Sequence, residues 1–116
     1  GSIVYEKRPQ QLYTAVSNDV AAKIKDLMVE TVENGTGKNA KISTIKVAGK
    51  TGTAENELKG KEKNKDHAWF VCFAPAENPQ IAVAVMLEYS GGSGGELCAP
   101  IARDIIRQYV KKRSGA

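Results

Sequence analysis

One short segment carries most of the residue types that could bind a ligand: Lys50, Thr51, Gly52 and Thr53 follow one another directly. They come after a run rich in β-branched residues, so we expect the segment to continue or end a strand. Alternation along a strand would place Lys50 and Gly52 on one face and both threonines on the other. Glycine inside a strand often marks the close approach of a ligand. A cation, two hydroxyls and accessible backbone N–H groups suit a ligand with a carbonyl and a carboxylate.

Two other interpretations of this segment have to be weighed. Gly49-Lys50-Thr51 matches the end of a phosphate-binding P-loop, but that pattern requires glycine where Thr44 stands. It also requires a helix that begins at the lysine, which Gly52 disfavours, so we exclude a P-loop. The simpler alternative is a strand end that carries a solvated lysine and binds nothing, and only the surrounding chain can decide against it.

Length and composition restrict the class of protein. The 116 residues form at most one domain, and the 41% that are hydrophobic can supply a core. Much of the net charge of +4 lies in one loop and the C-terminal tail, which does not indicate a nucleic-acid interface. We find no membrane-spanning run and no signal peptide. Gly1-Ser2 resemble residues left by cloning, so an anchor could have been removed.

The cysteines and the single histidine do not indicate a metal site. Cys72 and Cys98 are too few and too far apart for a disulfide framework. Neither cysteine stands at zinc-ligand spacing from His67. We therefore expect no metal and no cofactor.

Apolar periodicity predicts a helix at each end of the chain. Ser17 is a good N-cap and Gly35 a good stop, so the first helix is expected at about 17–34. A second helix is expected at about 97–112, with basic residues at its C-terminal end. Each has an apolar stripe at helical spacing: Val20, Ile24, Leu27, Met28 and Val32 in the first, and Leu97, Ile101, Ile105 and Tyr109 in the second.

Three strands are expected between the helices, at about 41–53, 67–75 and 80–89. The second and third are apolar on both faces, which is typical of strands covered on both sides. The third has small residues on one face, Ala82 and Ala84, where a helix could approach closely. The charged segment 55–66 is expected to be a solvated loop and the glycine run 91–95 a flexible turn. The fold class is therefore α+β, a three-stranded antiparallel sheet whose helices cover either both faces or one.

The segment Lys50 to Thr53, followed by His67 to Pro75, resembles the C-terminal part of the transpeptidase domain of penicillin-binding proteins. K-T-G is one of the motifs of these proteins and of class A β-lactamases. The resemblance runs from about Ser17 to Val110, includes Gly35-Thr36-Gly37 and the Gly91 to Gly95 run, and is strongest to the class B, monofunctional branch. It implies that residues 3–116 are the C-terminal portion of a domain with the penicillin-binding protein and serine β-lactamase-like fold. An all-helical half and a further strand beside the third would then be missing.

The resemblance also implies a function and a set of site residues. The parent would be a serine-type D,D-transpeptidase on the outer side of the bacterial cytoplasmic membrane. It would cross-link peptidoglycan stem peptides and be acylated by β-lactams. Lys50 would supply electrostatics and hydrogen bonds, and the hydroxyls of Thr51 and Thr53 would bind the carboxylate of the ligand. The Thr53 N–H would be an oxyanion-hole donor, and Gly52 would keep the surface open.

Three further positions are interpreted from the same resemblance. His67 and Trp69 flank the K-T-G-T region in the family pattern. We interpret His67 as a structural residue at a strand end rather than an acid or base. Cys72 stands where glycine is common in the family, and a buried thiol there should be inert.

Acyl transfer needs a nucleophile and a base, which the family takes from a helix-borne S-x-x-K. We reject the literal match Ser43 to Lys46, because residues three apart on a strand point to opposite faces. Ser17-Asn18-Asp19 resembles the second motif, S-x-N, in composition, but a helix cap explains it. The chain alone is therefore expected to be inactive, with the remainder of its own domain as partner. The alternative is a non-catalytic envelope module that binds peptides or proteins through a strand edge.

Overall fold

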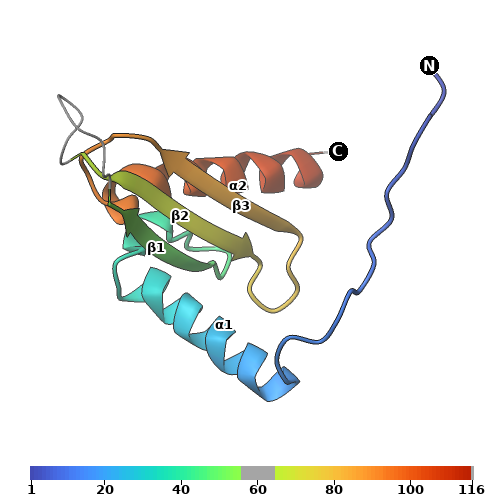
Figure 1. The fold of residues 1–116 in the computed structure, drawn as a ribbon, viewed down its shortest axis with the longest axis horizontal. Coiled ribbons are helices and arrows are strands. Elements are labelled where there is room, and N and C mark those ends of the chain that lie inside the picture. The colour runs from blue at the N-terminus through green and yellow to red at the C-terminus, as the bar shows by residue number, and fades with distance from the viewer. Residues whose placement is uncertain (56–64, 116) are drawn as a thin grey trace.

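The computed structural model describes residues 1–55 and 65–115. The elements follow in the order α1 (Asn18–Glu33), η1 (Lys38–Ala40), β1 (Ala48–Ala54), β2 (His67–Ala74), β3 (Ile81–Leu87), η2 (Gly94–Cys98) and α2 (Ala99–Ser114) (Figure 1). The predicted three-stranded sheet and both predicted helices are confirmed. Residues 1–16 form neither helix nor strand. Most of the predicted charged loop, residues 56–64, lies outside the described part of the chain.

The sheet is antiparallel with the order β1-β2-β3, and β2 is its central strand. Alternate residues of β2 differ sharply in exposure. Ala68, Phe70, Cys72 and Ala74 are buried, whereas Trp69 and Val71 are 38% and 41% exposed. Within this chain the sheet therefore has one covered face and one largely open face. The prediction that the strands are covered on both sides is wrong for the chain by itself.

The covered face packs against α2, but Leu97 is the member of the predicted stripe that packs against the core, and Ile101 and Ile105 do not. Ala99, Ala102 and Ile106 are fully buried in one cluster with Phe70 of β2. Ile101 and Ile105, which the four-residue spacing placed on the packing side, are 41% and 42% exposed. Because successive helical residues are 100° apart, the two apolar sets occupy different faces of α2. The sheet receives the face with the smaller residues, which allows the helix to approach closely.

The small-residue face of β3 does not receive a helix from this chain. Ala82 and Ala84 are exposed, and the neighbouring Ile81, Val83, Val85 and Leu87 are the ones packed against the core. The prediction that a helix approaches Ala82 and Ala84 closely is therefore wrong here, because α2 lies on the opposite face.

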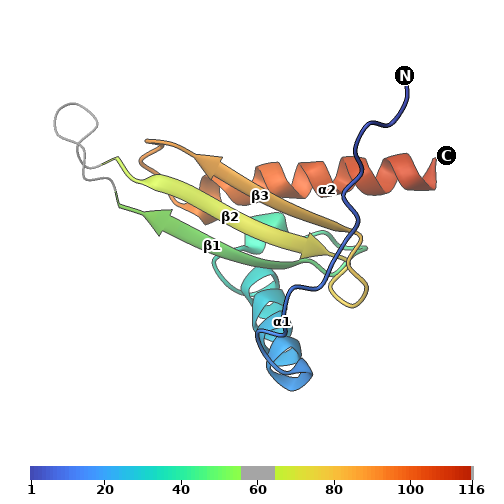
Figure 2. The same ribbon diagram turned by 45° about the vertical axis from the view of Figure 1, so that its right-hand side comes forward.

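Helix α1 begins and ends close to where the sequence predicted. The Ser17 side chain accepts a hydrogen bond from Val20 N at 3.3 Å, and the N–H groups of Gly35 and Gly37 both donate to Thr31 O, at 3.1 and 3.0 Å. Val32 is the only buried residue of the helix. Figure 2 shows α1 below β1, at that edge of the sheet, and α2 next to β3. Most of the apolar stripe of α1 is thus exposed.

Strand β1 begins at Ala48 and not near residue 41. Ile42 and Ile45 instead form an isolated bridge that closes a tight turn with Ser43 and Thr44 at its tip. The Glu33 carboxylate supports this turn from α1, at 2.6 Å from Lys41 Nζ and 3.2 Å from Lys46 Nζ. The β-branched run is therefore split by a local hairpin, and our strand-based reason for rejecting Ser43 and Lys46 was wrong. Ser43 lies in a turn rather than a helix, and Lys46 is paired with Glu33, so the rejection itself stands.

Candidate functional site

The K-T-G-T segment lies within β1, at an edge of the sheet. Lys50 pairs with Val71 and Gly52 pairs with Trp69. A Cβ added to Gly52 would lie 3.5 Å from Trp69 Cβ and within 4 Å of nothing else. Gly52 and Trp69 therefore share the open face of the sheet, while the Thr51 methyl group contacts the glycine loop on the α2 side. The predicted alternation along the segment is confirmed.

Lys50 is exposed, and its ammonium group is held against the strand. Its Nζ donates a hydrogen bond to Thr51 O at 2.6 Å. The positive charge therefore lies at the strand backbone, beside the uncrowded surface over Gly52. Apart from Trp69 Cβ, no described atom lies within 4 Å of the position that a Cβ on Gly52 would occupy, so that surface is accessible to a ligand.

The two threonines differ in their surroundings. Thr53 is exposed. Thr51 is half-buried, and its Oγ1 lies 2.9 Å from Thr36 Oγ1, within hydrogen-bonding distance. Thr36 belongs to the loop that follows α1, and sequence reasoning gave it no role in the site. The only available signal was its position between two glycines in Gly35-Thr36-Gly37, which does not by itself indicate contact with a distant strand.

Gly94 and Gly95 were predicted to belong to a flexible turn, but both are buried. A Cβ on Gly94 would overlap the Trp69 carbonyl oxygen, and one on Gly95 would overlap the Thr36 carbonyl oxygen. Both glycines therefore lie directly on the backbone of neighbouring segments, where no side chain fits. That prediction is wrong for these two positions, because a glycine run signals close packing as well as flexibility.

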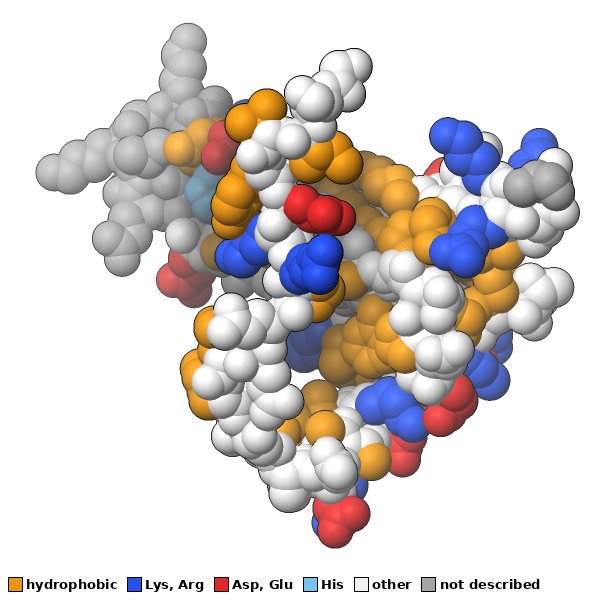
Figure 3. Space-filling model, turned by 90° about the vertical axis from the view of Figure 1, so that its right-hand side faces the viewer, with side chains coloured by type: hydrophobic (Ala, Val, Ile, Leu, Met, Phe, Trp, Pro, Cys, Tyr) orange, Lys and Arg blue, Asp and Glu red, His pale blue; other side chains and the backbone are white. Residues whose placement is uncertain are grey.

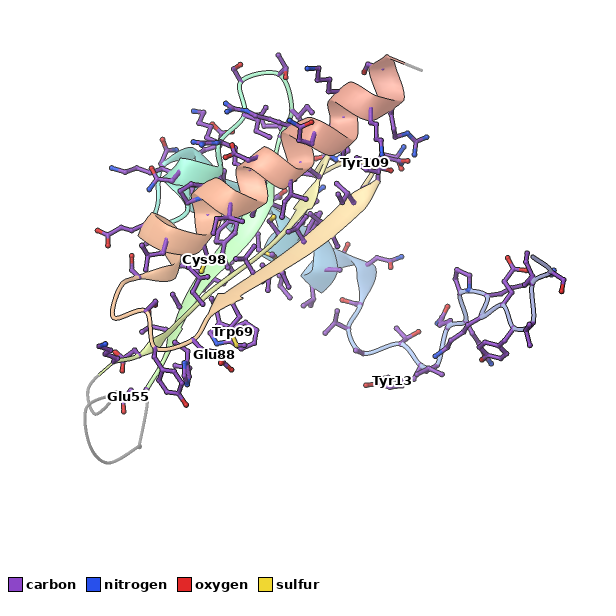
Figure 4. All side chains as sticks on the ribbon, turned by 90° about the horizontal axis from the view of Figure 1, so that it is seen from above. Tyr13, Glu55, Trp69, Glu88, Cys98 and Tyr109 are labelled. Carbon is purple, nitrogen blue, oxygen red and sulfur yellow. The ribbon has the colours of Figure 1, made fainter. Side chains whose placement is uncertain are left out.

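His67 and Trp69 occupy the strand that pairs with β1, in different settings. His67 Nδ1 accepts a hydrogen bond from Tyr89 N at 3.0 Å, and the two rings are 4.6 Å apart in edge geometry. His67 pairs with Ala54, at the far end of β1 from Lys50. These contacts agree with a structural role for His67. Trp69 is next to Gly52 and projects from the side of the sheet away from α2, as Figure 4 shows.

The cysteines are buried thiols. Burial raises the pKa of Cys72 to about 11 and also raises the pKa of Cys98, whose Sγ donates to Ala68 O at 3.3 Å. Figure 4 shows Cys98 between α2 and the strands. At neutral pH both thiols are protonated, which makes them poor nucleophiles and poor metal ligands. Within residues 1–55 and 65–115, no three histidine, cysteine or acidic side chains gather as a metal site.

The described serines are candidate nucleophiles, and three of them have structural hydrogen bonds. Ser17 and Ser93 cap helices, the latter by accepting from Glu96 N at 3.2 Å. Ser90 Oγ donates to Asp66 O at 3.5 Å. The hydroxyls of Ser17, Ser90 and Ser93 thus bond to backbone groups rather than to a lysine or histidine side chain. The arrangement can hold an anionic ligand with a carbonyl group, but it does not display an activated nucleophile.

An apolar hollow lies next to the K-T-G-T segment of β1. Met28 of α1 and four residues of the sheet's open face line it: Val71, Phe73, Ala82 and Ala84. Figure 3, viewed from the side of the termini, shows apolar side chains gathered in a hollow of the surface. Exposed apolar area of this kind marks an interaction surface.

Comparison with known proteins identifies relatives over most of the chain. The family model described as penicillin binding protein transpeptidase domain matches residues 2–107. The chain is 41% identical over 110 residues to the peptidoglycan D,D-transpeptidase PbpA of Mycolicibacterium smegmatis, which covers 91% of this chain and 22% of that protein. It is 40% identical over 104 residues to the peptidoglycan D,D-transpeptidase MrdA of Haemophilus influenzae, a match that covers 80% of this chain and 16% of that protein.

Solved structures agree with these relatives. The D,D-transpeptidase domain of a peptidoglycan glycosyltransferase from Eggerthella lenta is similar with a TM-score of 0.78 and 36% identity, over 97% of this chain and 25% of that one. Penicillin-binding protein A from Mycobacterium tuberculosis, solved as a ceftriaxone acyl-enzyme complex, gives a TM-score of 0.73 and 40% identity, over 84% and 22%. The chain thus spans 22% and 16% of the lengths of these two curated relatives. No helix within the described residues is long and apolar enough to cross a membrane.

Proposed function

Because this chain belongs to the penicillin-binding protein transpeptidase domain family, we propose that it forms one wall of the active site of a peptidoglycan D,D-transpeptidase of the class B type. The observation that carries the proposal is the geometry of β1. An ammonium group and an uncrowded glycine on one face of β1, and two hydroxyls on the other face, border the same sheet edge in one continuous segment from Lys50 to Thr53. A serine-type acyl transfer would then occur on a substrate held against this wall.

Each residue of the wall has a proposed role in binding a stem peptide that ends in a carboxylate. The hydroxyls of Thr51 and Thr53 donate hydrogen bonds to that carboxylate, and such charge-assisted bonds are among the strongest in proteins. Lys50 supplies a positive charge nearby, and the Thr53 N–H is one donor of the oxyanion hole. Removing one such donor typically lowers the rate by about 10²–10³. A β-lactam carries a carboxylate and a carbonyl too, and is held in the same way.

The nucleophilic serine and its base would come from the remainder of the domain, which we propose as the main partner of this chain. The open face of the sheet offers Trp69, Val71 and Met86, all more than a third exposed. The exposed stripe of α1 adjoins it through Met28, at the apolar hollow. Burial of this surface by the missing half would complete the cleft over Lys50 and remove the apolar side chains from water. The complete enzyme would act on the outer side of the bacterial cytoplasmic membrane, where peptidoglycan lies.

The proposal is tested by covalent labelling with a fluorescent penicillin. We expect no adduct with the chain alone, and an adduct when the remainder of its domain is co-expressed with it. Lys50→Ala should reduce this labelling strongly. Lys46→Ala is the matched control, because Lys46 is paired with Glu33 in the turn before β1, and it should leave labelling unchanged.

Three results would contradict the proposal. Labelling of the isolated chain would mean that it holds its own nucleophile. Unchanged labelling with Lys50→Ala would remove Lys50 from the site. A folded complex that never reacts, but binds peptides at the β1 edge, would favour the non-catalytic envelope module instead.

A further inference from the structure

Thr36 lies outside the K-T-G-T segment but touches it. Its Oγ1 is 2.9 Å from Thr51 Oγ1. The backbone on either side of Thr36 is fixed, since the N–H groups of Gly35 and Gly37 both donate to Thr31 O at the end of α1. Thr36 is thus presented to β1 from the end of a helix.

The Thr51 side chain is also held in one orientation. Gly95 packs against both partners, because a Cβ there would lie 3.4 Å from Thr51 Cγ2 and would overlap Thr36 O. Gly95 is itself fixed, since its carbonyl accepts from Asn39 Nδ2 at 2.9 Å. With its methyl group against Gly95, Thr51 points its hydroxyl towards Thr36.

The direction of the hydrogen bond between the two hydroxyls decides what Thr51 can offer a ligand. A hydroxyl has one proton to donate and can accept two hydrogen bonds. If Thr51 donates to Thr36, it faces an incoming carboxylate with lone pairs only, which repel the anion. If Thr36 donates to Thr51, the Thr51 proton is free for the carboxylate. Chains of hydrogen bonds in this sense also strengthen one another.

We propose that Thr36 is a positioning residue for ligand binding: its hydroxyl donates to Thr51 Oγ1 and so directs the Thr51 proton to the ligand carboxylate. The inference rests on the proposed function, because it assigns the order of donors within the same carboxylate site. Thr36 acts through Thr51 and is not itself a catalytic residue.

The test measures the second-order rate of acylation by a penicillin in the complete transpeptidase that contains this chain. Thr36→Val keeps the β-branched shape and removes the hydroxyl, so the rate should fall about three- to ten-fold, the range expected for one neutral hydrogen bond. Thr36→Ser keeps the hydroxyl and should restore most of the rate. In a double-mutant cycle, Thr36→Val should add little to the loss caused by Thr51→Val, because the two hydroxyls act as one unit.

A purely structural role of Thr36 is distinguished by comparing a penicillin with a free carboxylate and its ester. With a penicillin whose carboxylate is esterified, Thr36→Val should change the rate by less than two-fold. Equal losses with the free acid and the ester, additive losses in the double-mutant cycle, or no loss with either ligand would each overturn the inference. Wild-type acylation and its loss with Lys50→Ala test the proposed function separately. If these two hold and Thr36→Val has no effect, only the role of Thr36 fails.

Discussion

Gly52 and Gly94 lie near the same strand pair, but they should respond in opposite ways to an added methyl group. In Gly94→Ala the new Cβ would overlap the Trp69 carbonyl oxygen and lie 2.8 Å from Trp69 C and 3.0 Å from Gly52 O. These are backbone atoms within the β1–β2 ladder, so they cannot move aside without breaking its hydrogen bonds. Overpacking of this kind costs about 1–3 kcal/mol, and we expect a value at the upper end of that range.

Gly52→Ala meets only ordinary van der Waals contact, at 3.5 Å from Trp69 Cβ. Alanine is favoured over glycine inside a strand by about 0.5–1 kcal/mol, because less backbone entropy is lost on folding. The two variants should therefore differ by about 2–4 kcal/mol in free energy of unfolding. With an m-value of about 2 kcal/mol per M, their urea midpoints should be separated by about 1–2 M.

The assay is urea unfolding followed by tryptophan fluorescence. Trp69 is the only tryptophan of the chain and lies beside both positions, so the signal is unambiguous. Gly52→Ala should remain stable yet impair penicillin labelling of the complete enzyme, because its methyl group would occupy the surface where we propose that the ligand binds. A wild-type midpoint for Gly94→Ala, or a loss of more than about 1 kcal/mol for Gly52→Ala, would refute this reasoning.

Three further predictions concern the core and its titrating groups. Ile106→Ala should lower the free energy of unfolding by about 2–5 kcal/mol and Ile105→Ala by less than about 1 kcal/mol, because the two side chains are 0% and 42% exposed; equal losses in urea unfolding would reverse our assignment of the helix face. Hydrogen bonds from two lysines lower the pKa of Glu33. The contribution of Glu33 to the free energy of unfolding is therefore present above about pH 4.3 and is lost as pH falls through the lowered pKa. Glu33→Gln should flatten the acid limb of a stability–pH profile. Burial raises the pKa of Cys72 to about 11, so the contribution of this thiol to the free energy of unfolding is complete below about pH 8.5 and is lost as pH rises towards 11. Cys72→Ala should reduce the decline in stability at alkaline pH. At pH 8 a thiol reagent should react far faster with the chain unfolded in urea than with the native chain.

Local patterns were sufficient to predict the order of the elements and the faces of the site strand. Ser17 and Gly35 marked the ends of α1 because caps act through neighbouring backbone groups. The alternation of Lys50 and Gly52 against the threonines required only the geometry of a strand. The family resemblance added the remaining site roles, and the comparisons confirm the family and the fold.

Long-range packing could not be predicted in the same way. The apolar stripe with Ile101 and Ile105 and the alternative face with Ile106 both satisfy helical periodicity, and only the sheet decides between them. The contact of Thr36 with Thr51 joins a helix end to a strand across a folded turn, and no local pattern records it. The burial of Gly94 likewise depends on Trp69, a residue of another strand.

The packing of Gly95 against Thr36 and Thr51 also has a consequence for the order in which the chain folds. Synthesis proceeds from the N-terminus, and the loop at Gly95 follows every strand of the sheet. We therefore expect that the strands can pair before Gly95 is in place against Thr51. We expect the Thr51 side chain to be confined from both sides, by Thr36 and by Gly95, only after residues 94–98 have packed against β1. In a nascent chain arrested before that point, the K-T-G-T segment would be present but the Thr51 hydroxyl would not yet have its fixed direction.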